Sequence, residues 1–162
     1  MISFDGIKDS LTHLAAPPLF YAELHREVSR FARNGQSFSL IRLLLLPNQP
    51  EGITLNEEPE SKYEVVVLDF AEILSRASRA EDLLARMGER EFIVLVHGRE
   101  NVAAMLVDRV MNRWQARCPE SLNNQGLTLP TLQSAHITAQ PNESALEVLN
   151  RLDRKVLVTA KL

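Results

Sequence analysis

Three absences limit what this chain of 162 residues can do. Its single cysteine, Cys118, excludes an internal disulfide and suits a reducing compartment. Lysine and arginine total 18 against 21 acidic residues, and the net charge of -3 gives no basic surface for nucleic acid. The most apolar run, LIRLLLLP, is too short to span a membrane and contains Arg42. We therefore expect a cytoplasmic domain, or the cytoplasmic part of a larger or membrane-associated protein, without nucleic-acid binding or direct membrane insertion.

Patterns of metal ligands are lacking as well. The histidines are too far apart for the close spacing of zinc ligands, and we expect them at the surface or in the core: His13, His25, His97 and His136. Four glutamates fall between positions 51 and 60, but no regular spacing organises them. The sequence therefore predicts no metal site.

What the chain does have is a clear alternation of helical and extended patterns. Helices are expected over 17–35, over 63–78, from a cap at Asn101 onward, and over 143–155, because apolar residues recur there at helical spacing. Strands are expected at the apolar runs 37–46, 83–87, 91–97 and 127–139. We expect one domain over 1–162, with a lead-in at 1–8 and a proline-rich acidic loop at 47–61.

The order of these elements indicates a fold class. Between the first and the last helix, the order strand–helix–strand–strand–helix–strand matches the ferredoxin-like split βαββαβ arrangement. We therefore predict an α/β (α+β) fold in which these six central elements form an antiparallel or mixed sheet with their two helices packed on one side. Pro130 cannot donate a backbone hydrogen bond, which favours a sheet edge or a bulge for the last strand.

Three motifs at fixed spacing carry a resemblance to a known family. The segment DSLTHL begins at Asp9, SAHITA lies in the last predicted strand, and the stretch FAEILSRASRAEDLLARMGEREF joins R-x-x-D to a five-residue loop. The chain resembles the GGDEF family, the diguanylate cyclase domains that join two GTP molecules into cyclic di-GMP. The resemblance runs from about Asp9 to the end and implies the nucleotide-cyclase-like version of the fold.

The signature loop departs from the family pattern. It reads Gly88, Glu89, Arg90, Glu91, Phe92, and the resemblance implies a metal-binding acid at the third position, where this chain has arginine. The family's other metal ligand, an aspartate at the end of the first strand, is also missing, since no carboxylate falls between Leu43 and Pro50. Magnesium needs oxygen ligands. We therefore expect no catalytic residues, no bound magnesium and no cofactor.

The R-x-x-D motif, by contrast, is retained at Arg79 and Asp82. The resemblance implies that this is the family's inhibitory site, which binds cyclic di-GMP outside the catalytic cleft, and that Arg109 on the next helix adds a further contact. Arginine can take a phosphate or a guanine edge by paired hydrogen bonds. An arginine and an aspartate three residues apart near a helix end are also commonly a solvated ion pair of little energetic consequence.

Two other arginines are weaker candidates for ligand contacts. Arg86 is expected to be structural, beside the hairpin. Arg90 has two interpretations, a phosphate contact that needs no metal or a solvated charge at the hairpin tip.

The sequence thus favours a degenerate, catalytically inactive GGDEF domain that acts as a receptor for cyclic di-GMP. Ligand binding would join two copies of the chain or hold it against a partner domain. One alternative is a dimerisation or interaction scaffold that binds no nucleotide. A less favoured one is residual cyclase activity in combination with an intact partner.

Overall fold

The computed structural model describes residues 6–46, 60–117 and 130–159. Its elements follow the predicted order, and only the two-residue strand β5 has no counterpart in the sequence patterns. In chain order they are α1 (Pro17–Asn34), β1 (Phe38–Leu46), α2 (Glu60–Ala77), β2 (Leu83–Arg86), β3 (Glu91–His97), α3 (Glu100–Gln115), β4 (Thr131–Thr138), α5 (Ala145–Arg154) and β5 (Val158–Thr159).

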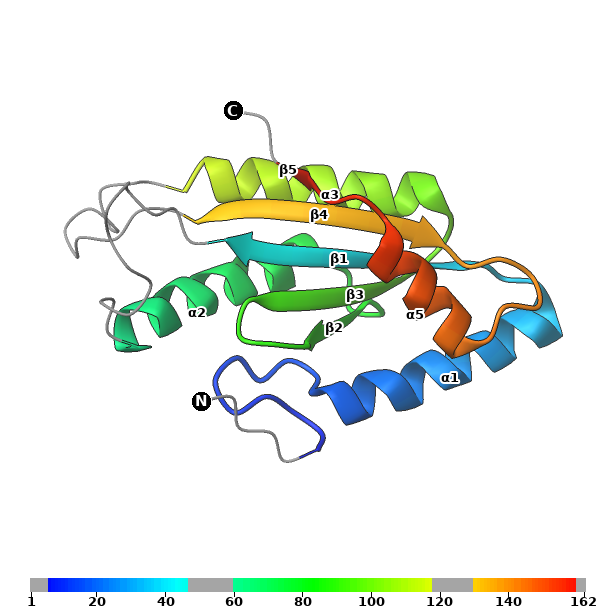
Figure 1. Ribbon diagram of the computed structural model, residues 1–162. Coiled ribbons are helices and arrows are strands. Elements are labelled where there is room, and N and C mark those ends of the chain that lie inside the picture. The colour runs from blue at the N-terminus through cyan, green and yellow to red at the C-terminus, as the bar shows by residue number, and fades with distance from the viewer. Residues whose placement is uncertain (1–5, 47–59, 118–129, 160–162) are drawn as a thin grey trace.

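The strands form one sheet in the order β2-β3-β1-β4-β5, and every pair of neighbours is antiparallel. The first four strands of that order are the ferredoxin-like core, with β1 at its centre between β3 and β4 (Figure 1). The predicted α/β fold is therefore confirmed. Of the two sheet types that the sequence left open, antiparallel and mixed, the structure has the antiparallel one.

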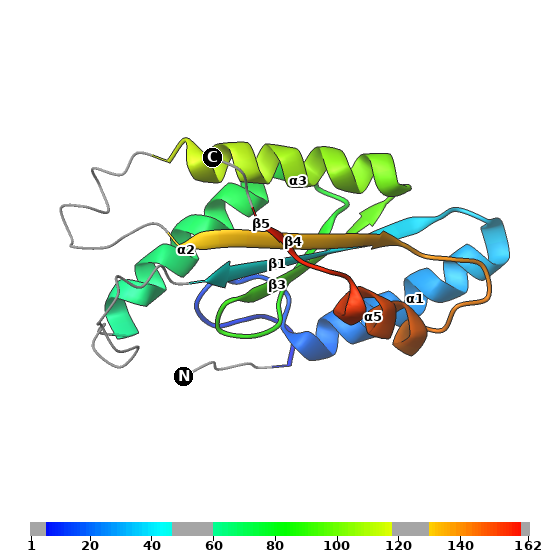
Figure 2. The same ribbon diagram turned by 45° about the horizontal axis from the view of Figure 1, so that its top comes forward.

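The two helices of the ferredoxin-like core, α2 and α3, lie on one side of the sheet as predicted, and α1 and α5, which lie outside that core in the chain, cover the other face. One apolar cluster joins α2 and α3 to the sheet, and a second cluster joins α1 and α5 to it. The two pairs of helices lie on opposite sides of the strands in both ribbon views (Figures 1 and 2). The physical reason is visible in β3, where five consecutive apolar residues are all buried and therefore require cover on both faces.

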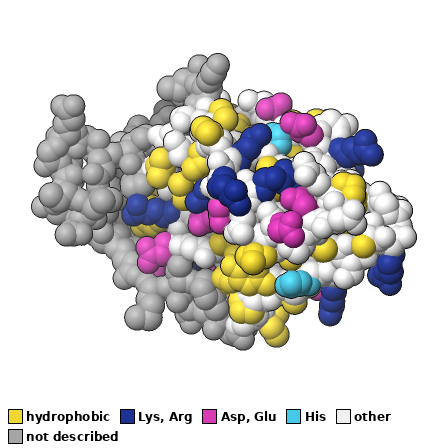
Figure 3. All heavy atoms as spheres, turned by 45° about the vertical axis from the view of Figure 1, so that its right-hand side comes forward, with side chains coloured by type: hydrophobic (Ala, Val, Ile, Leu, Met, Phe, Trp, Pro, Cys, Tyr) yellow, Lys and Arg dark blue, Asp and Glu magenta, His cyan; other side chains and the backbone are white. Residues whose placement is uncertain are grey.

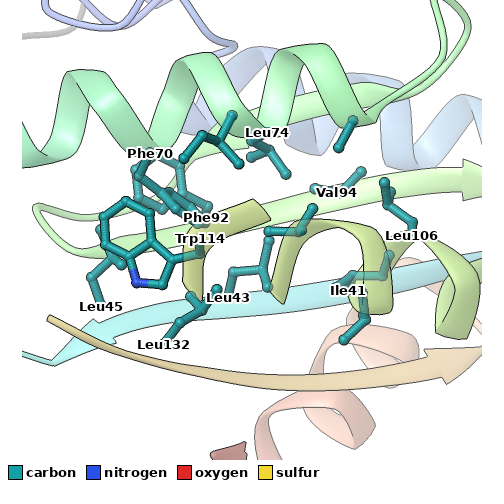
Figure 4. Packing of buried hydrophobic residues seen from close by; sticks show 14 of the residues in the cluster. Ile41, Leu43, Leu45, Phe70, Leu74, Phe92, Val94, Leu106, Trp114 and Leu132 are labelled. Atoms are coloured by element: carbon teal, nitrogen blue, oxygen red, sulfur yellow. The ribbon is translucent and has the colours of Figure 1, made fainter. Parts of the chain in front are cut away.

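Aromatic side chains fill the core between the sheet and the α2–α3 pair (Figure 4). The ring of Phe70 meets Phe92 at 4.9 Å and Trp114 at 5.4 Å between centroids, both edge to face. The indole Nε1 of Trp114 donates to the carbonyl of Pro130 at 3.0 Å. This face therefore supplies a rigid platform behind β3 and the signature loop.

Several predicted boundaries need correction. The N-cap of α3 is Arg99, without a side-chain capping bond, so Asn101 lies inside the first turn and does not cap the helix. Pro130 precedes β4, and β4 has neighbours on both sides, so this strand is neither a bulge nor the sheet edge. Residues 60 and 61 of the predicted loop belong to α2, whereas 47–59 lie outside the described residues.

The start of the chain is tied to the sheet. Of the predicted lead-in 1–8, residues 6–8 are described, and Lys8 forms an isolated bridge with Ala15. Ala15 in turn exchanges backbone hydrogen bonds with Leu84 and Arg86, which covers the outer edge of β2. Among the described helices, none combines the length and apolar character needed to cross a membrane.

Candidate functional site

The R-x-x-D residues lie in the turn that joins α2 to β2. The carboxylate Oδ2 of Asp82 accepts from the backbone N–H of Arg79 at 2.8 Å, and the N–H of Asp82 donates to the carbonyl of Arg79 at 3.1 Å. Aspartate commonly closes turns in this way, by binding backbone N–H groups close in sequence. The expected alternative of a solvated ion pair is therefore wrong, because the carboxylate binds backbone and not the guanidinium.

The guanidinium of Arg79 is exposed and has no hydrogen bond or ion pair with any residue that the structure describes. Its backbone, in contrast, is held at both the N–H and the carbonyl by Asp82. The turn thus presents a cation from a fixed base to the solvent. A ligand contact with this group would not have to displace an internal partner.

Arg109 approaches the same turn from α3. Its Nε donates to the carbonyl of Ala77, the last residue of α2, at 3.2 Å. A cation at this place satisfies one of the free carbonyls of the helix end and complements the helix dipole. Arg109 is therefore partly structural, while the rest of its half-buried guanidinium borders the surface beside Arg79.

Arg79, Asp82 and Arg109 line one small hollow, which we call the R-x-x-D hollow. Its volume of about 40 Å³ holds a few water molecules and not a nucleotide, so a large ligand would lie across its mouth. The sequence-predicted site residues are therefore neighbours in space. The other lining residues are Glu81, Val96, His97, Val102, Met105 and Leu106.

Charges of both signs are interspersed on this molecule. On the face drawn in Figure 3, acidic side chains lie beside the basic ones, with hydrophobic side chains between them. The R-x-x-D hollow follows the same pattern, since two arginines share it with Glu81 and Asp82. A ligand would therefore be recognised here by contacts with individual side chains, and not by a broad electrostatic potential of one sign.

The signature loop connects β2 to β3, and two of its three charged side chains, those of Arg90 and Glu91, have partners within the described part of the chain. The guanidinium carbon of Arg90 lies 4.5 Å from the centre of the Tyr63 ring, a cation–π contact with α2. The expectation that Arg90 is a solvated charge is therefore wrong. Glu91 accepts from Nε of Arg42 on β1 at 2.9 Å. Phe92 is buried in the core, and Glu89 is exposed.

The residues around this loop do not fit a magnesium ion. The carboxylate of Glu91 is engaged by Arg42, and Arg90 adds a second guanidinium close by, whereas magnesium needs oxygen ligands. Within 6–46, 60–117 and 130–159, no three side chains of the histidine, cysteine, aspartate or glutamate type gather as a metal site would require. The segment 47–59 lies outside the described residues.

Arg86 is structural, as its position predicted. Its Nη1 lies 3.1 Å from Oδ2 of Asp9, and both side chains are almost fully buried. Asp9 also accepts from the N–H and the hydroxyl of Thr12 at 2.9 and 2.7 Å. The D-x-L-T motif therefore builds a closed N-terminal turn whose acid neutralises a buried arginine of β2.

His97 is a lining residue of the hollow that sequence reasoning did not assign to the site. It ends β3, and its Nε2 lies 3.0 Å from Oε1 of Glu27 on α1. No local pattern could have indicated this contact, because the two residues are 70 positions apart. The signal that existed was a polar residue closing an otherwise apolar strand.

Comparisons with known proteins agree with this geometry. The family described as "Diguanylate cyclase, GGDEF domain" matches residues 63–161. The GGDEF domain of DgcB from Caulobacter crescentus, solved with c-di-GMP, superimposes with a TM-score of 0.79 at 21% identity, covering 94% of this chain and 89% of that one. No curated protein sequence matches the chain.

Two structures from Pseudomonas aeruginosa are similar as well. The FimX GGDEF domain has a TM-score of 0.74 at 18% identity and covers 91% of this chain and 89% of its own. Diguanylate cyclase SiaD, solved with its activator SiaC, has a TM-score of 0.74 at 22% identity. That match covers 90% of this chain but only 55% of SiaD. At these identities the likenesses establish the fold.

Proposed function

We propose that this chain, which belongs to the GGDEF domain family, is a receptor for cyclic di-GMP that binds its ligand at the R-x-x-D hollow and has no cyclase activity. The observation that carries the proposal is the contrast between two sets of arginines. Arg79 presents a guanidinium without an internal partner beside Asp82 and Arg109. Arg42 and Arg90, near the signature loop, are both engaged within the chain.

The chemistry of the hollow suits this ligand. Cyclic di-GMP carries two phosphodiester charges and two guanine edges, and an arginine can bind either group through paired hydrogen bonds. Asp82 uses Oδ2 to close the turn, which leaves Oδ1 to accept from the guanine N1–H and N2–H groups. Val102 and Met105 give the hollow an apolar wall on α3, against which a base can lie.

The residues near the signature loop support the proposed absence of cyclase activity. Joining two GTP molecules needs a divalent cation to neutralise the triphosphates, and the described side chains near the signature loop do not fit that cation. The only acid of the loop next to β1 is held by Arg42 at 2.9 Å. The function that remains is recognition without turnover, with no magnesium or other cofactor.

Binding must change an equilibrium if it is to carry a signal. A ligand does so only when it favours one arrangement over another. Because the hollow is too small to enclose a nucleotide, a ligand across its mouth leaves one side exposed, and a second copy of the chain or a partner domain can cover that side. We therefore propose a change in association as the output.

Calorimetric titration with cyclic di-GMP tests the proposal directly. We expect a dissociation constant of about 1 μM, equivalent to about -8 kcal/mol. Arg79→Ala removes one side of a charge-assisted contact that is typically worth about 2–5 kcal/mol, so the affinity should fall by about 30-fold or more. The matched control is Arg76→Ala, three residues earlier on α2, where the arginine is 74% exposed and pairs with Glu72.

The possible outcomes separate the hypotheses. Equal affinity of wild type and Arg79→Ala would show that the ligand binds elsewhere. No heat of binding at a protein concentration of about 100 μM would exclude a micromolar receptor altogether. The chain would then be better explained as an interaction scaffold that has kept the R-x-x-D turn for its backbone geometry.

A further inference from the structure

We propose that a second cleft, at the end of the sheet where β4 leaves it, binds a small organic anion that joins one anionic group to a flat apolar body. We call it the end cleft, and its lining residues lie within 31–37, at Arg99 and within 138–142. Its volume of about 550 Å³ is in the range of about 300–1,000 Å³ that is typical of small-molecule sites. It shares no lining residue with the R-x-x-D hollow, so the proposal does not depend on the proposed function.

Three segments that are far apart in the sequence form the end cleft. The last turn of α1 with the residues that follow it forms one wall, the loop between β4 and α5 forms another, and Arg99 stands at the start of α3. All three segments lie at the same end of the sheet in both ribbon views (Figures 1 and 2). Backbone hydrogen bonds fix them there, from the N–H of Gly98 to the carbonyl of Ser37 at 3.1 Å and from the N–H of Ala139 to the carbonyl of Phe38 at 2.9 Å. The packing of the whole fold therefore builds this cleft.

The charge of the end cleft favours an anion. Arg99 is the only charged residue that lines it, and the next residue, Glu100, does not. The side chain of Arg99 is exposed and has no hydrogen bond or ion pair with any residue that the structure describes. The acid in the loop beyond β4, Glu143, is already bound by Arg151. A carboxylate or phosphate can therefore bind the guanidinium of Arg99 through paired hydrogen bonds without displacing an internal partner.

Ser37 gives a second and independent indication of a ligand. Its hydroxyl oxygen is buried and has no hydrogen-bond partner in the part of the chain that the structure describes. Buried polar groups are nearly always hydrogen-bonded, so an unpaired hydroxyl calls for an explanation. Because Ser37 lines the cleft, rotation about its one side-chain torsion can bring the hydroxyl to a ligand without breaking an internal hydrogen bond.

The remaining lining residues suit a flat apolar body. Phe31 is half-buried on the α1 wall, and its ring is held edge to face against Phe38 at 6.3 Å between centroids. Pro141 is exposed on the loop wall, between Gln140 and Asn142. An aromatic ring can pack against the apolar side chains of both walls, and the two carboxamides can donate to or accept from polar groups at its edge.

A chemical-shift titration of the isotope-labelled chain with naphthyl phosphate tests the proposal, since this probe joins a phosphate to a flat apolar body. We expect saturable shifts at the backbone amides of Gly35, Gly98 and Asn142, with half-saturation at about 1 mM or below. The amides of Arg79 and Asp82 should not shift. Inorganic phosphate, which lacks the apolar body, should bind at least about tenfold more weakly.

Three variants test the contacts. Arg99→Gln removes the charge-assisted contact and should weaken binding by about tenfold or more. Ser37→Ala should weaken binding by about threefold without lowering the melting temperature, because its hydroxyl has no partner within the described chain. Ala32→Trp places a bulky side chain on an exposed position of the α1 wall and should abolish binding by filling the cleft. The matched control is Arg113→Gln, which removes the same charge from an exposed position in the last turn of α3 and should bind like wild type.

Several results would overturn the proposal. These are shifts that do not saturate or that fall outside the end cleft, equal affinity for naphthyl phosphate and inorganic phosphate, or an Arg99→Gln variant that binds as well as wild type. A lower melting temperature of Ser37→Ala would show that the hydroxyl already has a partner and is not held in reserve for a ligand. The receptor proposal is tested separately by the titration with cyclic di-GMP, so either proposal can fail without the other.

Discussion

Asp82 illustrates how one side chain can serve the fold and the site at once. Its Oδ2 accepts a hydrogen bond from the backbone N–H of Arg79 and so closes the turn. The turn fixes the backbone position from which the side chain of Arg79 extends. A substitution at Asp82 therefore changes two quantities, the stability of the turn and the contact with the ligand. Two different substitutions can separate them.

Asp82→Ala removes the hydrogen-bond acceptor, and we expect the free energy of unfolding to fall by about 1 kcal/mol because the N–H of Arg79 loses its partner. Asp82→Asn keeps an oxygen for that N–H, so stability should stay close to wild type. Its amide group, however, presents a donor to the guanine donors, and cyclic di-GMP binding should weaken as much as in the alanine variant. Denaturant unfolding and calorimetry measure the two effects.

Glu81→Ala is the control for stability, since Glu81 is an exposed neighbour in the same turn. It should unfold like wild type. The interpretation of the turn would be contradicted if Asp82→Asn lost as much stability as Asp82→Ala. Arg79→Ala should also keep the wild-type stability, because only its backbone takes part in the turn.

Among the elements, α5 is attached to the sheet by an ion pair in addition to its buried apolar residues. Arg151 on α5 bonds the two carboxylate oxygens of Glu143 at 2.7 and 2.8 Å and donates to the carbonyl of Thr138, the last residue of β4, at 2.6 Å. Glu143 also accepts from the N–H of Gln140. The hydrogen bond from Arg151 holds the pKa of Glu143 below its usual value, and burial opposes the shift without cancelling it.

The sign of the pH dependence follows from that lowered pKa. The contribution of Glu143 to stability is present above its unfolded pKa near 4.5 and is lost as the pH falls through the lower folded value. We expect Glu143→Gln to cost about 1 kcal/mol near pH 6, since Arg151 is partly exposed and solvent screens the pair. At a pH below the lowered folded pKa, the variant and wild type should have nearly the same free energy of unfolding.

Urea unfolding at several pH values measures this difference. Glu72→Gln is the matched control, because Glu72 pairs with Arg76 at 2.7 Å but both side chains are more than half exposed. Its cost should be smaller at every pH. If the stability lost in Glu143→Gln did not shrink as the pH falls below the ordinary carboxyl range, the pair would not stabilise the attachment of α5 through its charge.

For the molecule as a whole, the sequence predicted the elements better than their packing. Helical spacing and short apolar runs located four helices and four strands, and the split βαββαβ order placed α2 and α3 on one face, but that order did not indicate that α1 and α5 cover the other face. The two residues of β5 are exposed and show no pattern. The spacing of Arg79 and Asp82 indicated the site, whereas the contact of His97 with Glu27 depends on how α1 packs, which local sequence does not reveal.

The last prediction at the scale of the molecule concerns cyclase activity. We expect the purified chain to form no cyclic di-GMP from GTP with Mg²⁺ or Mn²⁺, because no carboxylate lies between Leu43 and Pro50 and the third signature residue is Arg90. Arg90→Glu should fail to restore activity, since the second ligand would still be missing and Arg42 would remain to compete for any acid placed there. Arg90→Glu should also lower stability by about 1 kcal/mol, because the cation–π contact with Tyr63 is lost. Product from wild type above a no-protein control, in a preparation free of host cyclases, would show that the residues outside the described ranges complete a working metal site.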